Sequence, residues 1–224
     1  INKNLVEIIG VCTKKNSSFN SDFFDLSQIC KKHEIDFRYC KKINEKKNIQ
    51  WIKKKSPDYI FCFGWSELLS HMILKIPKFG SIGYHPSLLP QNRGRHPIIW
   101  TIALGLKFIG STFFWMTKKA DDGQIINQNK IKVSVNDDSK IVYRKIIKSA
   151  IIQIKNFIPK LNHKKRVIIR PNNKNKKGNY WRKRSYLDGQ IDWRMNALNI
   201  FNLTRALTFP YPYSHFVHNG KKIE

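Results

Sequence analysis

One histidine occupies a position from which an imidazole could transfer protons. His85 lies where an apolar run, predicted to be a buried strand, gives way to a loop bracketed by Pro86 and Pro90. In sheets built from alternating strands and helices, ligands bind at strand ends of this kind. The two prolines stiffen the loop, and a stiff loop holds an imidazole in the fixed orientation that general acid or base catalysis requires. His85 is therefore a candidate catalytic residue.

A pair of carboxylates follows 36 residues later. Asp121 and Asp122 precede Gly123 between two predicted strands, at an end of the sheet that the topology could bring beside His85. A carboxylate next to an imidazole fixes its tautomer and stabilises its charged form. Each feature alone has an ordinary structural interpretation, because a histidine before a proline is commonly a loop residue and Asp-Asp-Gly is a turn signal.

The segments that would position these residues alternate between strand and helix patterns. Strands are predicted at 4–13, near Phe37, and at 58–63, 79–84, 108–116 and 125–135, the last as an edge or antiparallel strand. Helices are predicted from Ser21 or Asp22 to Cys30, from Ser66 to Ile73, from Pro97 to about Gly105, and over 196–207. This alternation predicts an α/β fold with a twisted, mostly parallel sheet, in which 58–63 is a central strand.

A long helix is predicted after the last of these strands. Asp137 or Asp138 would cap it and Pro159 would mark its end. Its predicted apolar stripe consists of Ile141, Ile147, Ile151, Ile154 and Ile158.

Four short segments, taken together in this order and spacing, resemble the formyltransferase family. They are the run His85–Pro90 (H-P-S-L-L-P), Arg93-Gly94, Gly110-Ser111-Thr112, and 120–126 (A-D-D-G-Q-I-I). The resemblance covers most of residues 5–158. The family includes methionyl-tRNA formyltransferase, glycinamide ribonucleotide transformylase and the sugar-nucleotide N-formyltransferases. It implies a Rossmann-like sheet with helices on both faces, and 10-formyltetrahydrofolate as cosubstrate without a metal.

The resemblance assigns roles to residues of this chain. His85 matches the family's catalytic histidine and Asp121 its catalytic aspartate. In that chemistry an amine attacks the formyl carbon, and the histidine, held by the aspartate, stabilises the developing oxyanion and moves the proton. The implied cosubstrate-binding residues are Glu67, Leu68, Leu69, Ser87, Leu88, Leu89, Pro90, Arg95, Thr117, Lys118, Lys119 and Ala120. The leucines at 68 and 69 could equally be core residues, and Arg95 a solvated loop charge.

One position departs from the family pattern. Two residues before the histidine the family has an asparagine that donates a hydrogen bond to the formyl oxygen, and this chain has Gly83. Loss of one such donor costs about 100- to 1,000-fold in rate. Either a backbone amide, a water or a neighbour such as Asn92 replaces it, or the protein is an impaired relative that binds folate or nucleic acid without efficient turnover.

The acceptor amine is predicted from the segment after the histidine loop. Arg93-Gly94-Arg95-His96-Pro97 resembles the R-G-R-x-P of the sugar enzymes more than the R-G-A-A-P of the tRNA enzymes. A second arginine there can hold a phosphate or a sugar. The D-x-x-I-D-W segment at 188–193 occurs in both branches. We therefore expect a nucleotide-linked amino sugar, with initiator methionyl-tRNA as the alternative.

The composition is strongly basic. Formal net charge is +27, and 32 of the 42 basic residues are lysines. A solvated lysine surface explains this excess, as does an anionic partner such as tRNA, a sugar nucleotide or the glutamate tail of folate. Four scattered cysteines fit buried thiols in a reducing cytosol. The longest apolar stretch, around 98–106, is shorter than the ~20 residues of a membrane-spanning helix, so we expect a cytoplasmic protein without a membrane partner. The sequence is also compatible with a homodimer.

The chain is divided into three predicted parts. Residues 1–161 would form the catalytic domain, with the family's first strand and helix lying before Ile1. Residues 162–190 are polar, basic and rich in asparagine, which predicts a linker. Residues 191–224 would contain a helix and the start of a small, truncated C-terminal β domain, including a hairpin turn at Asn219-Gly220.

Overall fold

The computed structural model describes residues 6–17, 23–161 and 177–224. Within these ranges the chain divides into two compact units. The first contains the residues up to Tyr84, Phe113–Ile126, and the end of the long helix from Ile154 onward. The second contains His85–Thr112, Asn127–Gln153 and the residues from 177 to the C-terminus.

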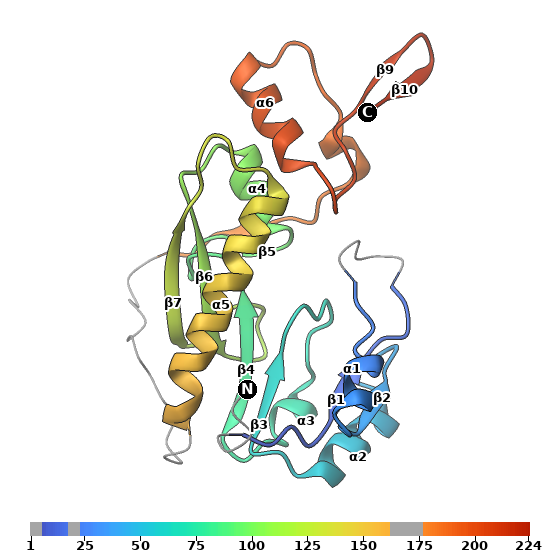
Figure 1. The fold of residues 1–224 in the computed structure, drawn as a ribbon, viewed down its shortest axis with the longest axis vertical. Helices are drawn as coiled ribbons and strands as arrows, with labels where there is room; N and C mark the ends of the chain where they lie inside the picture. The colour runs from blue at the N-terminus through green and yellow to red at the C-terminus, as the bar shows by residue number, and fades with distance from the viewer. Residues whose placement is uncertain (1–5, 18–22, 162–176) are drawn as a thin grey trace. The chain divides into compact units, whose positions relative to one another are not determined.

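The first unit begins with two short parallel strands, β1 (Val11–Thr13) and β2 (Phe37–Tyr39). Along the chain, helix α1 (Ser27–Lys32) lies between these two strands and helix α2 (Lys46–Lys55) follows β2 (Figure 1). Strand β3 (Tyr59–Cys62) then pairs in parallel with β4 (Gly80–His85), and the four-residue helix α3 (His71–Leu74) connects them. A buried cluster of Cys40, Ile43, Ile52, Leu69 and Ile73 forms a core here.

Several predicted boundaries in this unit were too generous. Strand β1 begins only at Val11, and residues 4 and 5 of the predicted strand lie outside the described residues, as do Ser21 and Asp22. Helix α1 begins at Ser27, so Phe23 precedes it, and α3 excludes Leu68 and Leu69. The short elements have little room for the apolar periodicity on which these predictions rested. Helix α2 was not predicted.

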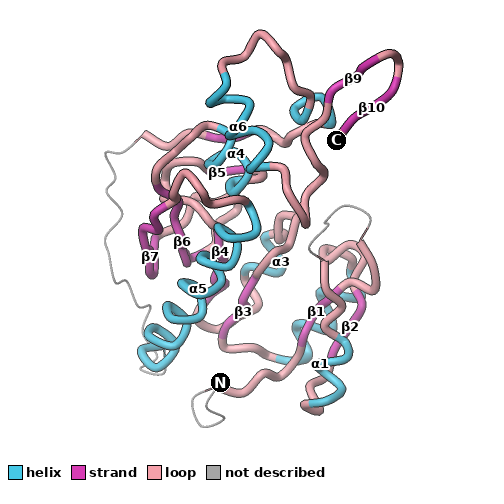
Figure 2. Tube along the Cα trace, turned by 45° about the horizontal axis from the view of Figure 1, so that its top comes forward, coloured by secondary structure: helices cyan, strands magenta, loops and turns pink. Residues whose placement is uncertain are grey.

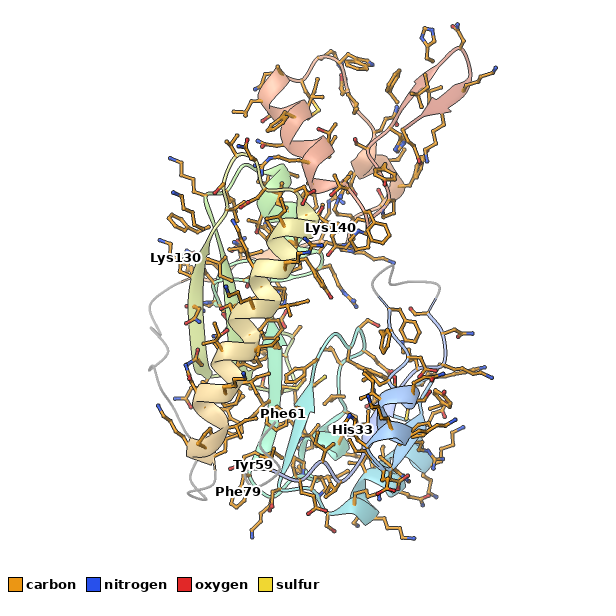
Figure 3. The ribbon with its side chains drawn as sticks, viewed as in Figure 1. His33, Tyr59, Phe61, Phe79, Lys130 and Lys140 are labelled. Atoms are coloured by element: carbon orange, nitrogen blue, oxygen red, sulfur yellow. The ribbon has the colours of Figure 1, made fainter. Side chains whose placement is uncertain are left out.

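The main sheet has the strand order β3-β4-β6-β7, with β6 at Phe108–Trp115 and β7 at Ile125–Lys132. Strand β6 is buried from Ile109 onward, which confirms the predicted buried strand. Strand β7 ends the order, which confirms the predicted edge position. Strand β3 was predicted to be central, but it is the other edge, and Phe61 is 36% exposed. Beside it, the rings of Tyr59 and Phe79 pack 5.2 Å apart (Figure 3).

The long helix α5 (Ser139–Leu161) confirms the predicted cap and only part of the predicted stripe. The backbone N–H of Ile141 donates to Asp138 Oδ1 over 2.8 Å. The buried residues of α5 are Ser139, Val142, Ile146, Gln153, Phe157, Ile158 and Leu161. Of the predicted stripe, Ile158 is buried, whereas Ile141, Ile147 and Ile151 are 38%, 42% and 48% exposed. Isoleucine is so frequent in this chain that its spacing alone did not identify the buried face. Pro159 lies inside the last turn rather than at the end.

The second unit contains α4 (Pro97–Ala103), which contacts α6 (Ala197–Ala206). Asn196 caps α6 by accepting a hydrogen bond from the backbone N–H of Asn199. A hairpin of β9 (Phe216–His218) and β10 (Lys221–Ile223) ends the chain (Figure 2). Asn219 and Gly220 have φ of 48° and 72°, which confirms the predicted type I′ turn.

The predicted linker is not featureless where the structure describes it. Residues 162–176 of it lie outside the described residues. After them, β8 (Tyr180–Trp181) pairs in parallel with β5 (Arg93–Gly94), and a 3₁₀ helix spans Tyr186–Gly189. The polar composition of this stretch concealed a strand because its partner is 87 residues away, beyond the reach of any local pattern.

Candidate active site

His85 is the last residue of β4, as predicted for a strand end that carries chemistry. Its side chain is buried, with 6% exposure. The ring nitrogen Nε2 lies 3.0 Å from the backbone carbonyl oxygen of Asn92. A carbonyl oxygen only accepts, so Nε2 is the donor in this bond. The loop that follows the strand therefore folds back and holds the imidazole.

Strand residues of the same unit support this loop. The hydroxyl of Thr112 donates to the Ser87 carbonyl over 2.6 Å, and Gln128 Nε2 donates to the Leu89 carbonyl over 3.0 Å. Gly110 approaches the loop so closely that a Cβ there would lie 2.1 Å from the Ser87 carbonyl. This contact explains why a glycine stands in the Gly-Ser-Thr segment, since a side chain would displace the loop beside His85.

Asp121 lies in the first unit, in the connection between β6 and β7. Its φ is 51°, an uncommon conformation for a residue with a side chain. The turn is tight, because the N–H of Trp115 donates to the Gln124 carbonyl and a Cβ on Gly123 would overlap the Trp115 carbonyl. Thr117 Oγ1 accepts from the backbone N–H of Lys119 in the same loop. His85 belongs to the second unit, so its pairing with Asp121 stays a prediction.

The predicted folate-binding residues around Glu67 have clear structural roles. The Glu67 carboxylate accepts hydrogen bonds from the backbone N–H of Ile43 and from Asn44 Nδ2, at 3.0 and 2.9 Å. Leu69 is 8% exposed and belongs to the buried cluster of the first unit. Leu68 is 57% exposed. Packing accounts for Leu69, whereas Leu68 remains accessible to a ligand, and contacts of either with folate stay a prediction.

The space beside Gly83 is filled. A Cβ at this position would lie 2.7 Å from Phe114 Cζ and 3.0 Å from Met116 Cγ. Real Cβ atoms do not approach other atoms this closely, so an asparagine would require both side chains to move. The absence of the family's amide is thus matched by aromatic packing from β6, a feature that the sequence comparison of single positions did not reveal.

A cationic cluster that sequence reasoning missed surrounds Trp100 in the second unit. The guanidinium carbons of Arg182 and Arg184 lie 5.3 and 5.7 Å from the indole ring centroid. Trp100 Nε1 donates to the Arg182 carbonyl over 3.1 Å. Burial lowers the pKa of the His96 imidazole below its ordinary value, and the positive charges of Arg184 and Arg95 act in the same direction. His96 thus lies among several cations.

The Asp188 carboxylate offsets part of the positive charge around Trp100. It forms an ion pair with Arg182 and accepts a hydrogen bond from the backbone N–H of Ser185. The Arg182 guanidinium, with this backbone bond, holds the pKa of the Asp188 carboxyl well below its usual range. The first aspartate of the D-x-x-I-D-W segment therefore orders residues 182–188 next to Trp100.

The fold and the loop define a class of protein: an α/β domain with a mainly parallel sheet and a buried histidine at a strand end. The formyl transferase family model matches residues 2–155, and the model of the formyl transferase C-terminal domain matches residues 184–224. The chain belongs to the formyl transferase family.

Individual relatives agree with this membership. The chain is 41% identical over 192 residues to the bifunctional polymyxin resistance protein ArnA of Wigglesworthia glossinidia brevipalpis, covering 86% of this chain and 29% of that protein. A 4-N formyltransferase from Francisella tularensis is 27% identical with a TM-score of 0.72, over 88% of this chain and 79% of that one. HypX from Aquifex aeolicus in complex with tetrahydrofolic acid shares the fold, at 16% identity and a TM-score of 0.70, over 95% and 36%.

No three histidine, cysteine, aspartate or glutamate side chains among the described residues gather as a metal ion would need. None of the described helices is both long and apolar enough to cross a bilayer.

Proposed function

We propose that this chain transfers a formyl group from 10-formyltetrahydrofolate to the primary amine of a nucleotide-linked amino sugar. The observation that carries the proposal is the buried His85 at the end of β4, held through Nε2 in the loop that the family motif defines. The relatives of this chain include ArnA and a 4-N formyltransferase. The chain spans 29% of the length of ArnA.

In the proposed reaction the acceptor nitrogen forms a bond to the formyl carbon, and the bond from that carbon to N10 of the folate breaks. The amine loses one proton and N10 gains one, so the reaction is balanced without an oxidant or metal. His85 would stabilise the oxyanion and transfer the proton, and Asp121 would hold its charged form. The chain's own contribution is to hold this imidazole in one orientation, away from bulk water.

Folate as the donor is supported by family membership and by the tetrahydrofolic acid complex of HypX. The structure adds that Leu68 is an exposed apolar side chain on the predicted binding segment, while Glu67 anchors that segment to residues 43 and 44. An anchored segment with an exposed leucine suits the flat, partly apolar pterin ring.

A sugar nucleotide as the acceptor is supported by the cations around Trp100. Arg95, Arg184 and Lys183 all lower the pKa of His96, so their charges converge near that ring. Guanidinium groups bind phosphate oxygens in pairs, and a diphosphate linking sugar and nucleotide would carry the matching charge. Trp100 offers an indole face in the same cluster.

The decisive experiment mixes the purified chain with 10-formyltetrahydrofolate and either UDP- or dTDP-linked 4-amino sugars or initiator methionyl-tRNA, and measures tetrahydrofolate release. We expect release with an amino-sugar nucleotide and not without an amine. Release only with the tRNA would replace the proposed acceptor, and folate binding without release would favour an impaired relative. His85→Ala and Asp121→Asn should each abolish release, whereas Lys177→Ala, at an exposed position, should not.

A further inference from the structure

Asn179 lies in a stretch that neither family model covers, since one match ends at residue 155 and the other begins at 184. We propose that Asn179 is a positioning residue for the candidate catalytic histidine. Through Asn92 it fixes the loop whose carbonyl oxygen selects the tautomer of His85. The kinetic part of this inference rests on the proposed function, while the tautomer itself does not.

The Asn179 side chain forms two hydrogen bonds with Asn92. Its Oδ1 accepts from the Asn92 backbone N–H over 2.7 Å, and its Nδ2 donates to Asn92 Oδ1 over 3.1 Å. The Asn179 carbonyl also accepts from the N–H of Arg93 over 3.0 Å. Three hydrogen bonds from one residue therefore hold the chain at Asn92. The carbonyl oxygen of Asn92 in turn accepts the hydrogen bond from His85 Nε2.

The chemistry of these groups leaves only one arrangement. A backbone N–H can only donate, so the Asn179 amide must present its oxygen to Asn92 and its nitrogen to the Asn92 side-chain oxygen. The Asn92 carbonyl can only accept, so His85 must carry a proton on Nε2. In the neutral ring the lone pair is then on Nδ1. The order of contacts thus runs from Asn179 through Asn92 to the reacting imidazole.

The backbone of Asn92 has φ 59°, in the left-handed region, which asparagine adopts more readily than most residues with side chains. The hydrogen bonds from Asn179 hold Asn92 in this conformation. The segment around Asn179 also packs tightly, because a Cβ on Gly178 would lie 2.4 Å from the Pro90 carbonyl oxygen. The adjoining β5–β8 pair, with Arg95 N–H donating to Trp181 O, extends this contact.

The competing interpretation is that residues 178–181 merely tether the chain and do not influence His85. The two interpretations differ in what happens to the imidazole when the Asn179 amide is removed while the strand pair is kept. Three full-chain variants separate them. Asn179→Ala removes both side-chain bonds, Asn179→Asp keeps the acceptor for the Asn92 N–H but loses the donor, and Lys177→Ala changes an exposed residue of the same segment.

The first readout is the protonation of the two ring nitrogens of His85, measured by long-range ¹H–¹⁵N NMR on protein labelled with ¹⁵N-histidine. The spectrum of His85→Ala assigns the signal among the seven histidines. We expect wild type and Lys177→Ala to show a proton on Nε2 in the neutral ring. Asn179→Ala should show a mixture of tautomers, and Asn179→Asp should lie between. An unchanged Nε2–H signal in Asn179→Ala would overturn the proposal, whether or not the wild type proves to be a formyltransferase.

The second readout is turnover with the acceptor found active. Misplacement of one catalytic group costs on the order of 10- to 100-fold, so we expect kcat of Asn179→Ala to fall by about that factor with KM changed less than about threefold. Asn179→Asp should recover part of the loss. A rise in KM at unchanged kcat would also overturn the proposal, because it would assign Asn179 to substrate binding. Circular dichroism melts identify a variant that fails to fold. If Asn179→Ala does not fold, kcat and the tautomer of His85 are compared between wild type and Asn179→Asp.

Discussion

The hydroxyl of Thr112 on β6 donates a 2.6 Å hydrogen bond to the carbonyl oxygen of Ser87, two residues after His85. The same hydroxyl accepts from Gln128 Nε2 over 2.9 Å, and Gln128 also donates to the Leu89 carbonyl. The loop that carries the candidate catalytic histidine is therefore bonded to the neighbouring strands at the carbonyls of Ser87 and Leu89. Its stiffness does not come from its prolines alone.

Thr112→Val tests this support. Valine has nearly the same shape but cannot donate, so the Ser87 carbonyl loses a buried partner and the loop loosens. We expect the free energy of unfolding to fall by about 1–3 kcal/mol and kcat to fall by about tenfold or more. Urea denaturation and tetrahydrofolate release measure the two effects. A Thr117→Val control, at an exposed hydroxyl outside this loop, should leave stability nearly unchanged.

Gln153 on α5 offers a test of the buried polar contacts behind the sheet. Its side chain is 1% exposed, accepts from the Ser111 hydroxyl over 2.5 Å, and donates to the Ser111 carbonyl and to Asn127 Oδ1. Gln153→Leu fills similar volume but removes these bonds, and we expect a loss of about 2–4 kcal/mol in unfolding free energy. Ile152→Gln, at a position 47% exposed, should change stability by less than about 0.5 kcal/mol. Equal effects of the two variants would contradict the network's importance.

The packing at Gly83 predicts that restoring the family's residue is harmful. Gly83→Asn places a Cβ 2.7 Å from Phe114 Cζ, and such overpacking costs about 1–3 kcal/mol. Phe114→Leu alone should also destabilise, by leaving a cavity. In the double variant the two defects compensate, so its loss should be smaller than the sum of the single losses. Chemical denaturation of all four proteins completes the cycle, and strict additivity would show that the two positions do not interact.

The ion pair of Asp188 and Arg182 predicts a pH dependence of stability. The pKa of Asp188 is depressed in the folded chain, so the carboxylate stabilises the fold above the ordinary aspartate pKa, about 4, and this contribution is lost as the pH falls below it. Asp188→Asn should therefore lower the melting temperature most at pH 7, and the difference from wild type should shrink by pH 3. Thermal melts at both values measure this.

Asp192 is a matched control for that experiment. Its pKa is lowered to about 2 by the Arg194 side chain two residues away, but the pair is exposed to solvent. Solvent and salt screen exposed pairs strongly, so Asp192→Asn should change the melting temperature much less at pH 7. A larger effect at Asp192 than at Asp188 would contradict the structural role assigned to residues 182–188.

The sequence by itself determined the α/β class, the alternation of strands and helices along the chain, the hairpin turn at Asn219-Gly220 and the place of His85 at a strand end. These features depend on short runs of residues: mainly apolar residues for β6, the Asn-Gly pair at the turn, and a motif of a few neighbouring positions around His85. Such patterns are local, so they survive without knowledge of the packing.

The tertiary structure alone decided which isoleucines of α5 are buried, what fills the space at Gly83, and that Asn179 returns to Asn92 beside His85. Each of these depends on side chains far apart in the chain, such as Asn179 and Asn92, 87 positions from one another. Their contacts arise only when strands and helices pack. Many apolar and polar residues of similar type could occupy a given buried position, and the packed structure accepts only those whose shape and hydrogen bonds fit. The candidate catalytic histidine could thus be predicted from the sequence, whereas the residues that hold it could be identified only from the fold.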